Sequence, residues 1–469
     1  MVFSSPTFLY YFLPVTLIVY FLMPTPKGSP RLKNIVLLAA SLVFYAWGEP
    51  RYVFLMAAQC ILTWGFGLLI NRARGKKSAK AYMVISIIVC FSGLIFFKYA
   101  NFFITNVNNA AKSNIPLIKL LMPIGISFYT FQLSSYTIDL YRGNVEAQRN
   151  VLDLSTYLAL FPQLIAGPIV RYSNVSAELA NRAHTVSGFA AGARRFIIGL
   201  GKKMLLANLF GQLVETFKQS GDRSVLFVWI YLLAYALQIY YDFSGYSDMA
   251  IGVGRILGFK FPENFNYPYI ADSITEFWRR WHMTLSSWFR DYVYIPLGGN
   301  RVKTLRFVVN IMVVWMLTGF WHGADWNFIL WGGYFGILLL FEKFFIGKAL
   351  GRAPSVLRHV YTVLIVLIGW AFFDASGFRA AFSIIGRMFG AGADAPAGRE
   401  ALYYLWSYAL PLLVGIIGAT PFIKKVAVKA EGHKALVTVA EPLLLAAILI
   451  ASTASMIDGS FNPFIYFRF

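Results

Sequence analysis

Charge is scarce in this sequence. Asp, Glu, Lys and Arg make up 13% of the 469 residues, about half of the roughly 25% typical of soluble domains. Hydrophobic residues make up 58%, so a soluble globular domain is excluded. The apolar segments, such as residues 34–47, are continuous, whereas a membrane β-barrel needs short strands of alternating polarity. The composition therefore predicts an all-α polytopic membrane protein.

Acidic residues are scarcer than basic ones, 21 against 42, which gives a net charge of +21. The basic residues stand in short clusters between apolar segments, as in residues 27–33 and 72–80. Lys and Arg concentrate in the cytoplasmic loops of membrane proteins, so both clusters are expected in the cytoplasm and the N-terminus outside. No soluble basic face exists, so nucleic acid is not an expected partner.

Motifs for metal and hydrolase chemistry are also lacking. The two cysteines, Cys60 and Cys90, both lie in apolar segments, where small buried residues are the simplest interpretation. The sequence has no HExxH, CxxC or GxSxG pattern, and "GVGRILG" is not a dinucleotide fingerprint. The first 24 residues lack the basic start and small-residue cleavage site of a signal peptide, which indicates a retained first span. We expect no bound metal and no bound cofactor.

Segments of about 17–25 apolar residues can cross a bilayer, and the sequence predicts about ten to twelve such helices. We interpret the chain as a single membrane domain, residues 1–469, with N-terminal helices in 1–150, a core in 151–346 and C-terminal helices in 347–469. The predicted spans lie near residues 7–23, 34–47 with 52–70, 81–100, 116–137, 151–169, 187–216, 224–243, 305–321, 325–346, 357–374, 402–420 and 436–453.

Residues 272–300 differ from these spans. At 100° per residue, the aromatic residues between Phe277 and Tyr292 share one face, and Arg279, Arg280 and Arg290 lie on the rest. This pattern predicts an amphipathic helix in the membrane interface, capped at its start by Ser273 or Thr275. The arginines could contact either lipid headgroups or the phosphates of a nucleotide donor.

Five histidines are present, and two of them draw attention. His184, His359 and His433 lie in polar loops or at the end of a span. His282 and His322 lie among tryptophans in apolar surroundings, where an ionisable group is costly. Such a histidine is often only a buried structural residue. A buried neutral imidazole can also accept a proton from a hydroxyl, as a general base does.

Polar residues interrupt two other apolar segments. The run "QIYYDFSGYSD" needs internal partners or a water-filled cavity in hydrocarbon. In "FPQLIAGPIVRYS", prolines and a glycine break a helix, which favours a kinked or re-entrant element. Helix ends would explain both equally well. The candidate cavity-lining residues are Gln163, Arg171, Gln238, Tyr241, Asp242, Ser244 and Tyr246, joined by Trp321 and Asp325 beside His322.

These motifs together resemble the membrane-bound O-acyltransferase family, and within it the bacterial branch that O-acetylates alginate and related polysaccharides. The resemblance rests on "FPQLIAGPIVRYS", "YDFSGYSDMAIGVGRILGFKFPENFNYPY", "FWRRWHMTLSSWFRDYVYIPLGGNR", "LTGFWHGADWNFILWGGYFG" and the terminal "NPFIYFRF". It implies a helical fold around a central funnel or tunnel, with His322 in the family's invariant histidine position and His282 in its second polar position.

The resemblance also implies an activity. An acetyl group would pass from a cytoplasmic donor such as acetyl-CoA towards an exported polysaccharide. Implied partners are membrane lipid and an extracytoplasmic SGNH-type acetyltransferase, and the implied location is the bacterial inner membrane. Two alternatives stay open: transfer of D-alanine or another acyl group, with an acyl carrier protein as donor, or transport of a glycan. Asp325 could cap the following helix as readily as serve a site.

Overall fold

The computed structural model describes residues 1–119, 121–165, 167–430, 432, 434–458 and 464–465, and its regular structure over these residues is helical, without strands. The all-α class is therefore confirmed. The chain divides into two compact units. Unit 1 comprises Met1–Phe196 and Tyr246–Pro262, and unit 2 comprises Ile197–Gly245 and Glu263–Phe469. Helices α10 and α12 each run from one unit into the other. The boundaries expected at residues 150 and 346 stay predictions.

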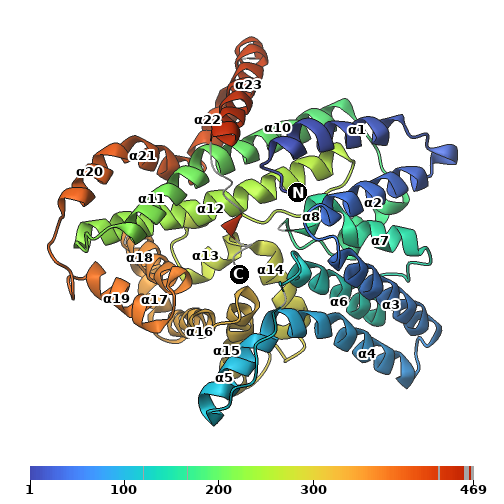
Figure 1. Cartoon of the computed structure of the whole chain (residues 1–469), viewed down its shortest axis with the longest axis horizontal. Helices are drawn as coiled ribbons and strands as arrows, with labels where there is room; N and C mark the ends of the chain where they lie inside the picture. The colour runs from blue at the N-terminus through green and yellow to red at the C-terminus, as the bar shows by residue number, and fades with distance from the viewer. Residues whose placement is uncertain (120, 166, 431, 433, 459–463, 466–469) are drawn as a thin grey trace. The chain divides into compact units, whose positions relative to one another are not determined.

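Unit 1 holds the N-terminal helices (Figure 1). They are η1 (Phe8–Phe12), α1 (Leu13–Leu22), η2 (Pro26–Gly28), α2 (Arg31–Ala46), α3 (Tyr52–Arg72), α4 (Lys77–Leu94), η3 (Ile95–Tyr99), α5 (Ala100–Ala111), α6 (Ile126–Arg142), α7 (Val151–Ala159), α8 (Phe161–Leu164), α9 (Tyr172–Ala180) and the start of α10 (Val186–Gly201). The end of α12 (Val225–Ile256) completes it. There α10 and α12 cross at Gly192 and Gly252, where a Cβ on either glycine would lie 2.6 Å from the other's carbonyl oxygen. Small residues at such crossings let membrane helices approach closely.

Unit 2 holds the remaining elements. They are η4 (Lys202–Ala207), α11 (Asn208–Gln219), η5 (Pro268–Ile270), α13 (Ile274–Arg280), α14 (Met283–Phe289), η6 (Arg290–Tyr294), α15 (Thr304–His322), α16 (Trp326–Phe341), η7 (Glu342–Ile346), α17 (Gly347–Arg352), α18 (Ser355–Asp374), α19 (Phe378–Met388), α20 (Arg399–Ser407), α21 (Ala409–Gly418), α22 (Phe422–Ala430) and α23 (Lys434–Asp458).

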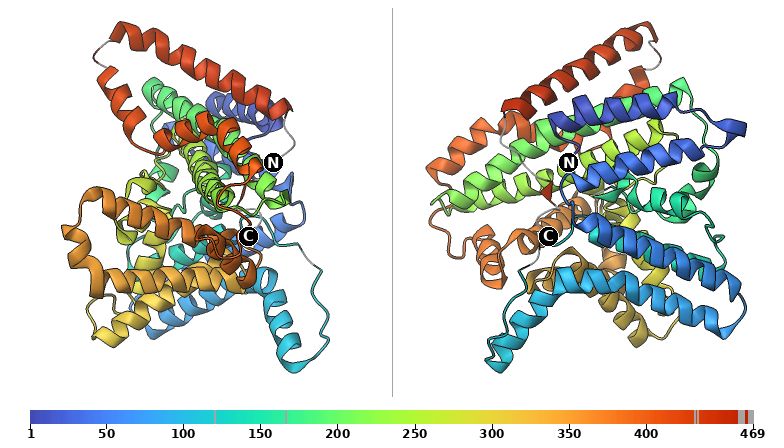
Figure 2. Two further views of the ribbon diagram at one scale, coloured as in Figure 1. Left: turned by 90° about the vertical axis from the view of Figure 1, so that its left-hand side faces the viewer. Right: turned by 45° about the vertical axis from the view of Figure 1, so that its right-hand side comes forward.

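The count of long apolar helices is lower than the sequence predicts. Within the described residues, eight helices are long and apolar enough to cross a membrane, or nine if α20 and α21, bent by 58°, form one span. Figure 2 shows one of them, α4, continuing through η3 into α5. The segments expected at 116–137 and 151–169 are shorter helices instead, α6 and the broken pair α7 and α8. The break at Leu160 confirms the interrupted helix that the prolines predict.

The close packing of α15 against α16 determines the position of the C-terminal end of α15. A Cβ at Gly319 would lie 2.1 Å from the carbonyl oxygen of Phe328, and one at Gly332 would lie 2.2 Å from that of Trp315. The backbones therefore meet in direct contact, which only glycine permits. His322 is the last residue of α15, one turn beyond this contact, so the helix crossing fixes its position.

The prediction of a single amphipathic helix over residues 272–300 is wrong. The segment forms α13, a turn at Trp281 and His282, then α14 and η6. Ser273 does cap α13, accepting a hydrogen bond from the backbone N–H of Glu276. The aromatic face packs on protein: Phe277 and Trp281 are at most 1% exposed and belong to the hydrophobic core of unit 2. Helical periodicity continues across the turn in the sequence, so it does not reveal the break.

Candidate active site

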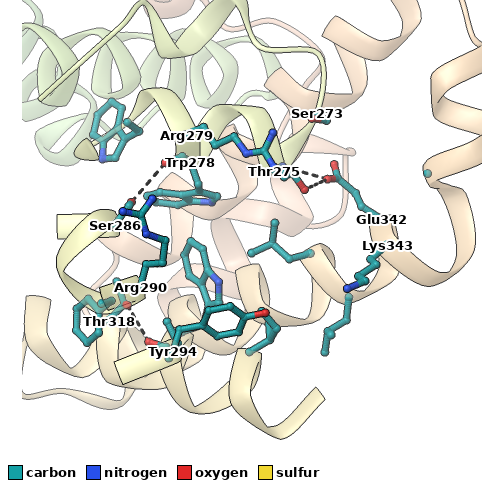
Figure 3. A pocket seen from close by; sticks show the side chains of 18 of the residues that line it. Ser273, Thr275, Trp278, Arg279, Ser286, Arg290, Tyr294, Thr318, Glu342 and Lys343 are labelled. Atoms are coloured by element: carbon teal, nitrogen blue, oxygen red, sulfur yellow. Dashed lines mark hydrogen bonds between the residues drawn. The ribbon is translucent and has the colours of Figure 1, made fainter. Parts of the chain in front are cut away.

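Unit 2 contains a cavity of about 740 Å³ lined by both His282 and His322. Its lining residues come from α13, α14, η6, α15, α16, η7 and α17, with Arg358 from α18, and Figure 3 shows many of them. The lining includes apolar residues such as Phe307 and Leu339 together with serine, threonine and basic residues. The two histidines that the sequence singled out are therefore brought to one cavity, although 40 positions separate them.

His322 lies in an aromatic enclosure at the end of α15. Its ring contacts Trp321, Trp331 and Phe373 at centroid distances of 5.0, 5.2 and 5.4 Å. The residue is 4% exposed. The helix ends at Gly323, which has an extended conformation. Packing against the three rings and the glycine contact of α15 with α16 therefore hold the imidazole in place.

His282 lies at the turn between α13 and α14 with a left-handed backbone, φ 43° and ψ 53°. Non-glycine residues rarely adopt this conformation, and in bulky residues it indicates strain held by the surrounding structure. The ring packs edge-on against Phe243 at 4.7 Å and lies 6.1 Å from the ring of Trp321. Burial lowers the pKa of His282 to about 3, so the imidazole is neutral at pH 7.

Asn264, which was not among the residues predicted from the sequence, holds this turn. Its side-chain oxygen Oδ1 lies 2.9 Å from Nδ1 of His282 and accepts a 2.8 Å hydrogen bond from the Thr284 hydroxyl. Its backbone carbonyl accepts the N–H of Met283 at 2.9 Å. Asn264 is 1% exposed. The turn therefore depends on a residue 18 positions earlier in the chain.

Four basic side chains line the same cavity as the histidines: Arg279, Arg290, Lys343 and Arg358. Arg290 is bonded to Asp291 at 2.7 Å, and Arg358 pairs with Asp272 at 2.9 Å. Both Arg279 and Lys343 are exposed. These basic lining residues are suited to contact an anionic group. Arg280, by contrast, bonds Glu276 at 2.6 Å and is not among the lining residues.

Glu342 links η7 to the start of α13, and both elements line the cavity (Figure 3). This carboxylate, at the start of η7, accepts the N–H of Ile274 at 2.6 Å and the N–H and hydroxyl of Thr275 at 3.0 and 2.8 Å. A negative charge at a helix N-terminus stabilises the helix. Glu342 therefore fixes α13, which leads directly to His282. The sequence did not indicate this role, because Glu342 lies near the end of the predicted span 325–346, with no partner in a local pattern.

Other predicted lining residues of unit 2 are not among the residues that line this cavity. Trp321 contacts both histidine rings. Asp242 bonds Lys203 at 2.6 Å and accepts the N–H of Ile465 at 2.7 Å. Tyr241 donates to the carbonyl of Gly415. The residues of this group outside the lining are Gln238, Tyr241, Asp242, Ser244, Trp321 and Asp325.

Asp325 occupies the N-cap position of α16, but its side chain makes no capping hydrogen bond, and it is exposed. Gln163, Arg171 and Tyr246 belong to unit 1. Within that unit, Gln163 is fully buried and donates to the carbonyl of Tyr157. The ring of Tyr246 stacks on that of Phe3 at 4.7 Å. Their part in the site stays a prediction. Of the terminal "NPFIYFRF", only residues 464 and 465 lie within the described residues.

Comparison with known proteins defines the class. Residues 146–365 match the model of the MBOAT, membrane-bound O-acyltransferase family. The chain is 42% identical over 397 residues to a probable alginate O-acetylase AlgI of Azotobacter vinelandii, covering 84% of this chain and 79% of that protein. The chain therefore belongs to the membrane-bound O-acyltransferase family, and it is a multi-pass membrane O-acyltransferase.

The names of two more distant relatives include another polymer or another acyl group. A peptidoglycan O-acetyltransferase of Helicobacter pylori is 34% identical over 421 residues, covering 83% of this chain and 80% of that protein. A teichoic acid D-alanyltransferase of Bacillus subtilis is 30% identical over 285 residues, covering 56% of this chain and 71% of that protein. The acyl groups and polymers in these names differ, whereas the family is shared.

Proposed function

We propose that this protein transfers an acetyl group from a cytoplasmic donor, acetyl-CoA, towards an exported alginate-like polysaccharide. The observation that carries the proposal is the cavity in which His282 and His322 lie beside basic side chains. The similarity to an alginate O-acetylase over 84% of the chain supports acetyl as the acyl group and a polysaccharide as its destination.

His322 acts as the general base in this proposal. Its imidazole takes the proton of an acceptor hydroxyl, whose oxygen attacks the thioester carbonyl carbon. The carbon–sulfur bond breaks, and the thiolate that leaves takes up a proton. The aromatic rings around His322 exclude water, which would otherwise compete as an acceptor.

The basic side chains provide the binding site for the donor. Arg279 and Lys343 line the cavity and are exposed, so their charged groups can bind phosphate by charge-assisted hydrogen bonds. A nucleotide thioester would place its phosphates there and its acyl end towards the histidines. Lipid headgroups are the competing occupants of the same side chains, since they carry the same phosphate chemistry.

The location and the partner follow from the same reaction. A cytoplasmic donor and an exported acceptor require the bacterial inner membrane. A protein outside that membrane, of the SGNH acetyltransferase type, would complete the transfer to the polysaccharide.

The test compares two histidine variants in cells that lack the native gene. We expect His322→Ala to reduce the acetyl content of the secreted polysaccharide by about 10²-fold or more, the range of a general base. His359→Ala is the matched control, because His359 belongs to unit 2 but does not line the cavity. Both variants should reach the membrane in wild-type amounts. Unchanged acetylation in His322→Ala would refute the proposal.

The donor is tested separately. Purified protein is incubated with acetyl-CoA, and release of free thiol is measured with and without Arg279→Ala. The proposal predicts thiol release that weakens when this cation is removed. Capture of an acyl carrier protein, together with inactivity towards acetyl-CoA, would favour D-alanyl transfer instead.

A further inference from the structure

The contacts of Asn264 determine which nitrogen of His282 carries a proton. The same oxygen, Oδ1, lies 3.4 Å from the backbone nitrogen of Thr284, 2.8 Å from the Thr284 hydroxyl and 2.9 Å from Nδ1 of His282. A backbone N–H can only donate a hydrogen bond, so the atom facing it must be the amide oxygen and not the amide nitrogen. An oxygen that accepts from Nδ1 requires a hydrogen on Nδ1.

A neutral imidazole carries one hydrogen on one nitrogen and a lone pair on the other. With Nδ1 protonated, Nε2 must hold the lone pair. Among the residues that the structure describes, Nε2 of His282 has no hydrogen-bond partner, although it is buried. A buried acceptor without a partner is costly, and His282 lines the cavity. Nε2 is therefore the ring nitrogen that could accept a hydrogen bond from a group bound in the cavity.

The backbone supports the same arrangement. His282 has a left-handed conformation, and the next residue, Met283, donates its N–H to the carbonyl of Asn264. The N–H of Ser286 bonds the carbonyl of His282 at 3.1 Å. Asn264 thus fixes the turn through its backbone and the ring through its side chain, which leaves the imidazole a single orientation.

We propose that Asn264 is a positioning residue that locks His282 in the Nδ1–H tautomer, so that Nε2 accepts a hydrogen bond from a substrate hydroxyl. His282 then cannot donate a hydrogen bond to a carbonyl oxygen in the cavity. The role of the accepted hydrogen bond rests on the proposed acyl transfer, whereas the tautomer does not. This assigns the two histidines to the side of the reaction that removes hydrogen from the acceptor.

The tautomer is measured on the full-length protein in lipid bilayers, labelled with ¹⁵N-histidine, by magic-angle-spinning NMR. The signals of His282 are identified by their loss in His282→Gln. We expect Nδ1 in the protonated range and Nε2 in the unprotonated range, unchanged between pH 8 and pH 5. A protonated Nε2 in the wild-type protein at pH 8 would overturn the proposal, whatever the enzymatic activity.

Variants of Asn264 test whether it is the cause. In Asn264→Asp a carboxylate still accepts from Nδ1 and favours the imidazolium, so both nitrogens should be protonated at pH 5. The acid limb of the activity profile should move upward by about one pH unit or more. Asn264→Leu should give mixed tautomers and low activity at every pH.

Thr284→Val is the matched control, since it removes a hydrogen bond to the same oxygen without touching His282. It should keep the wild-type tautomer and pH profile. An Asn264→Asp protein with the wild-type pH profile and spectrum would overturn the role of Asn264. If that variant does not fold, the wild-type spectrum decides alone. A correct tautomer in a protein without acyltransferase activity would refute the proposed function and leave the tautomer standing.

Discussion

Replacing Glu342 by glutamine tests whether the hydrogen bonds from its carboxylate to the start of α13 stabilise the protein and hold His282 in place. Glu342 accepts three hydrogen bonds, from two backbone N–H groups and one hydroxyl of Ile274 and Thr275, and it is 5% exposed. Glutamine keeps one acceptor oxygen and puts an NH₂ group, which cannot accept, in place of the other. At least one buried N–H at the start of α13 then loses its partner.

The expected destabilisation follows from these contacts. Leaving a buried donor unpaired costs about 1–3 kcal/mol, and losing the negative charge at a helix N-terminus costs about 0.3–1 kcal/mol more. We therefore expect Glu342→Gln to lower the free energy of unfolding by about 1–4 kcal/mol. Because α13 leads to His282, a shift of the turn by about 1 Å would reduce acyl transfer by up to roughly 10²-fold.

Thermal unfolding of the purified protein, followed by tryptophan fluorescence, measures the stability, and thiol release from the acyl donor measures activity. Glu276→Gln is the control on the same helix. Its pair with Arg280 is about one third exposed, at 31% and 26%, and such pairs contribute about 0–1 kcal/mol. Equal melting temperatures for the two variants, or wild-type activity in Glu342→Gln, would refute the role given to Glu342.

Two further predictions concern buried charge. Between its ordinary pKa near 6.5 and its native pKa of about 3, His282 is protonated more in the unfolded chain than in the folded one, so the free energy of unfolding should fall as the pH drops through this range. Unfolding midpoints should show a shallower pH dependence in His282→Gln, and identical slopes would contradict the low native pKa. Lys203 and Asp242 form a 2.6 Å ion pair with side chains 5% and 3% exposed; Lys203→Met should cost about 3–5 kcal/mol by leaving a buried carboxylate unpaired, and a wild-type yield and melting temperature would contradict this.

The sequence revealed the chemistry of the site better than its construction. His282 and His322 stand out because imidazoles are costly in apolar segments, a signal that needs no knowledge of the fold. Ser273 could be identified as a cap because capping depends on neighbours in the chain. The glycines at 319 and 332 are visible in the sequence, but which backbones they bring together is not.

Asn264 and Glu342 were not predicted as site residues, for the same reason in both cases. Each acts on a segment far along the chain, 18 and 68 positions away, and neither lies in a local pattern that marks such a contact. Asp242 illustrates a second limit of the sequence. Its place in a polar run indicated a cavity wall, whereas both carboxylate oxygens are engaged, one by Lys203 and one by the backbone of Ile465. A residue of a buried ion pair and a residue that lines a cavity both look like a polar residue in an apolar segment, so the sequence does not distinguish them.

The left-handed turn at His282 sets backbone strain against side-chain packing. Glycine reaches φ 43° without a steric penalty, whereas an L-residue in this region costs about 1–2 kcal/mol. Glycine at position 282 would remove this backbone strain, but it would also delete a buried ring that packs on Phe243 and bonds Asn264, and a large-to-small change in a core costs about 2–5 kcal/mol. The packing around the imidazole therefore outweighs the strain of the turn, so the same contacts that hold the ring in the cavity also stabilise the folded chain.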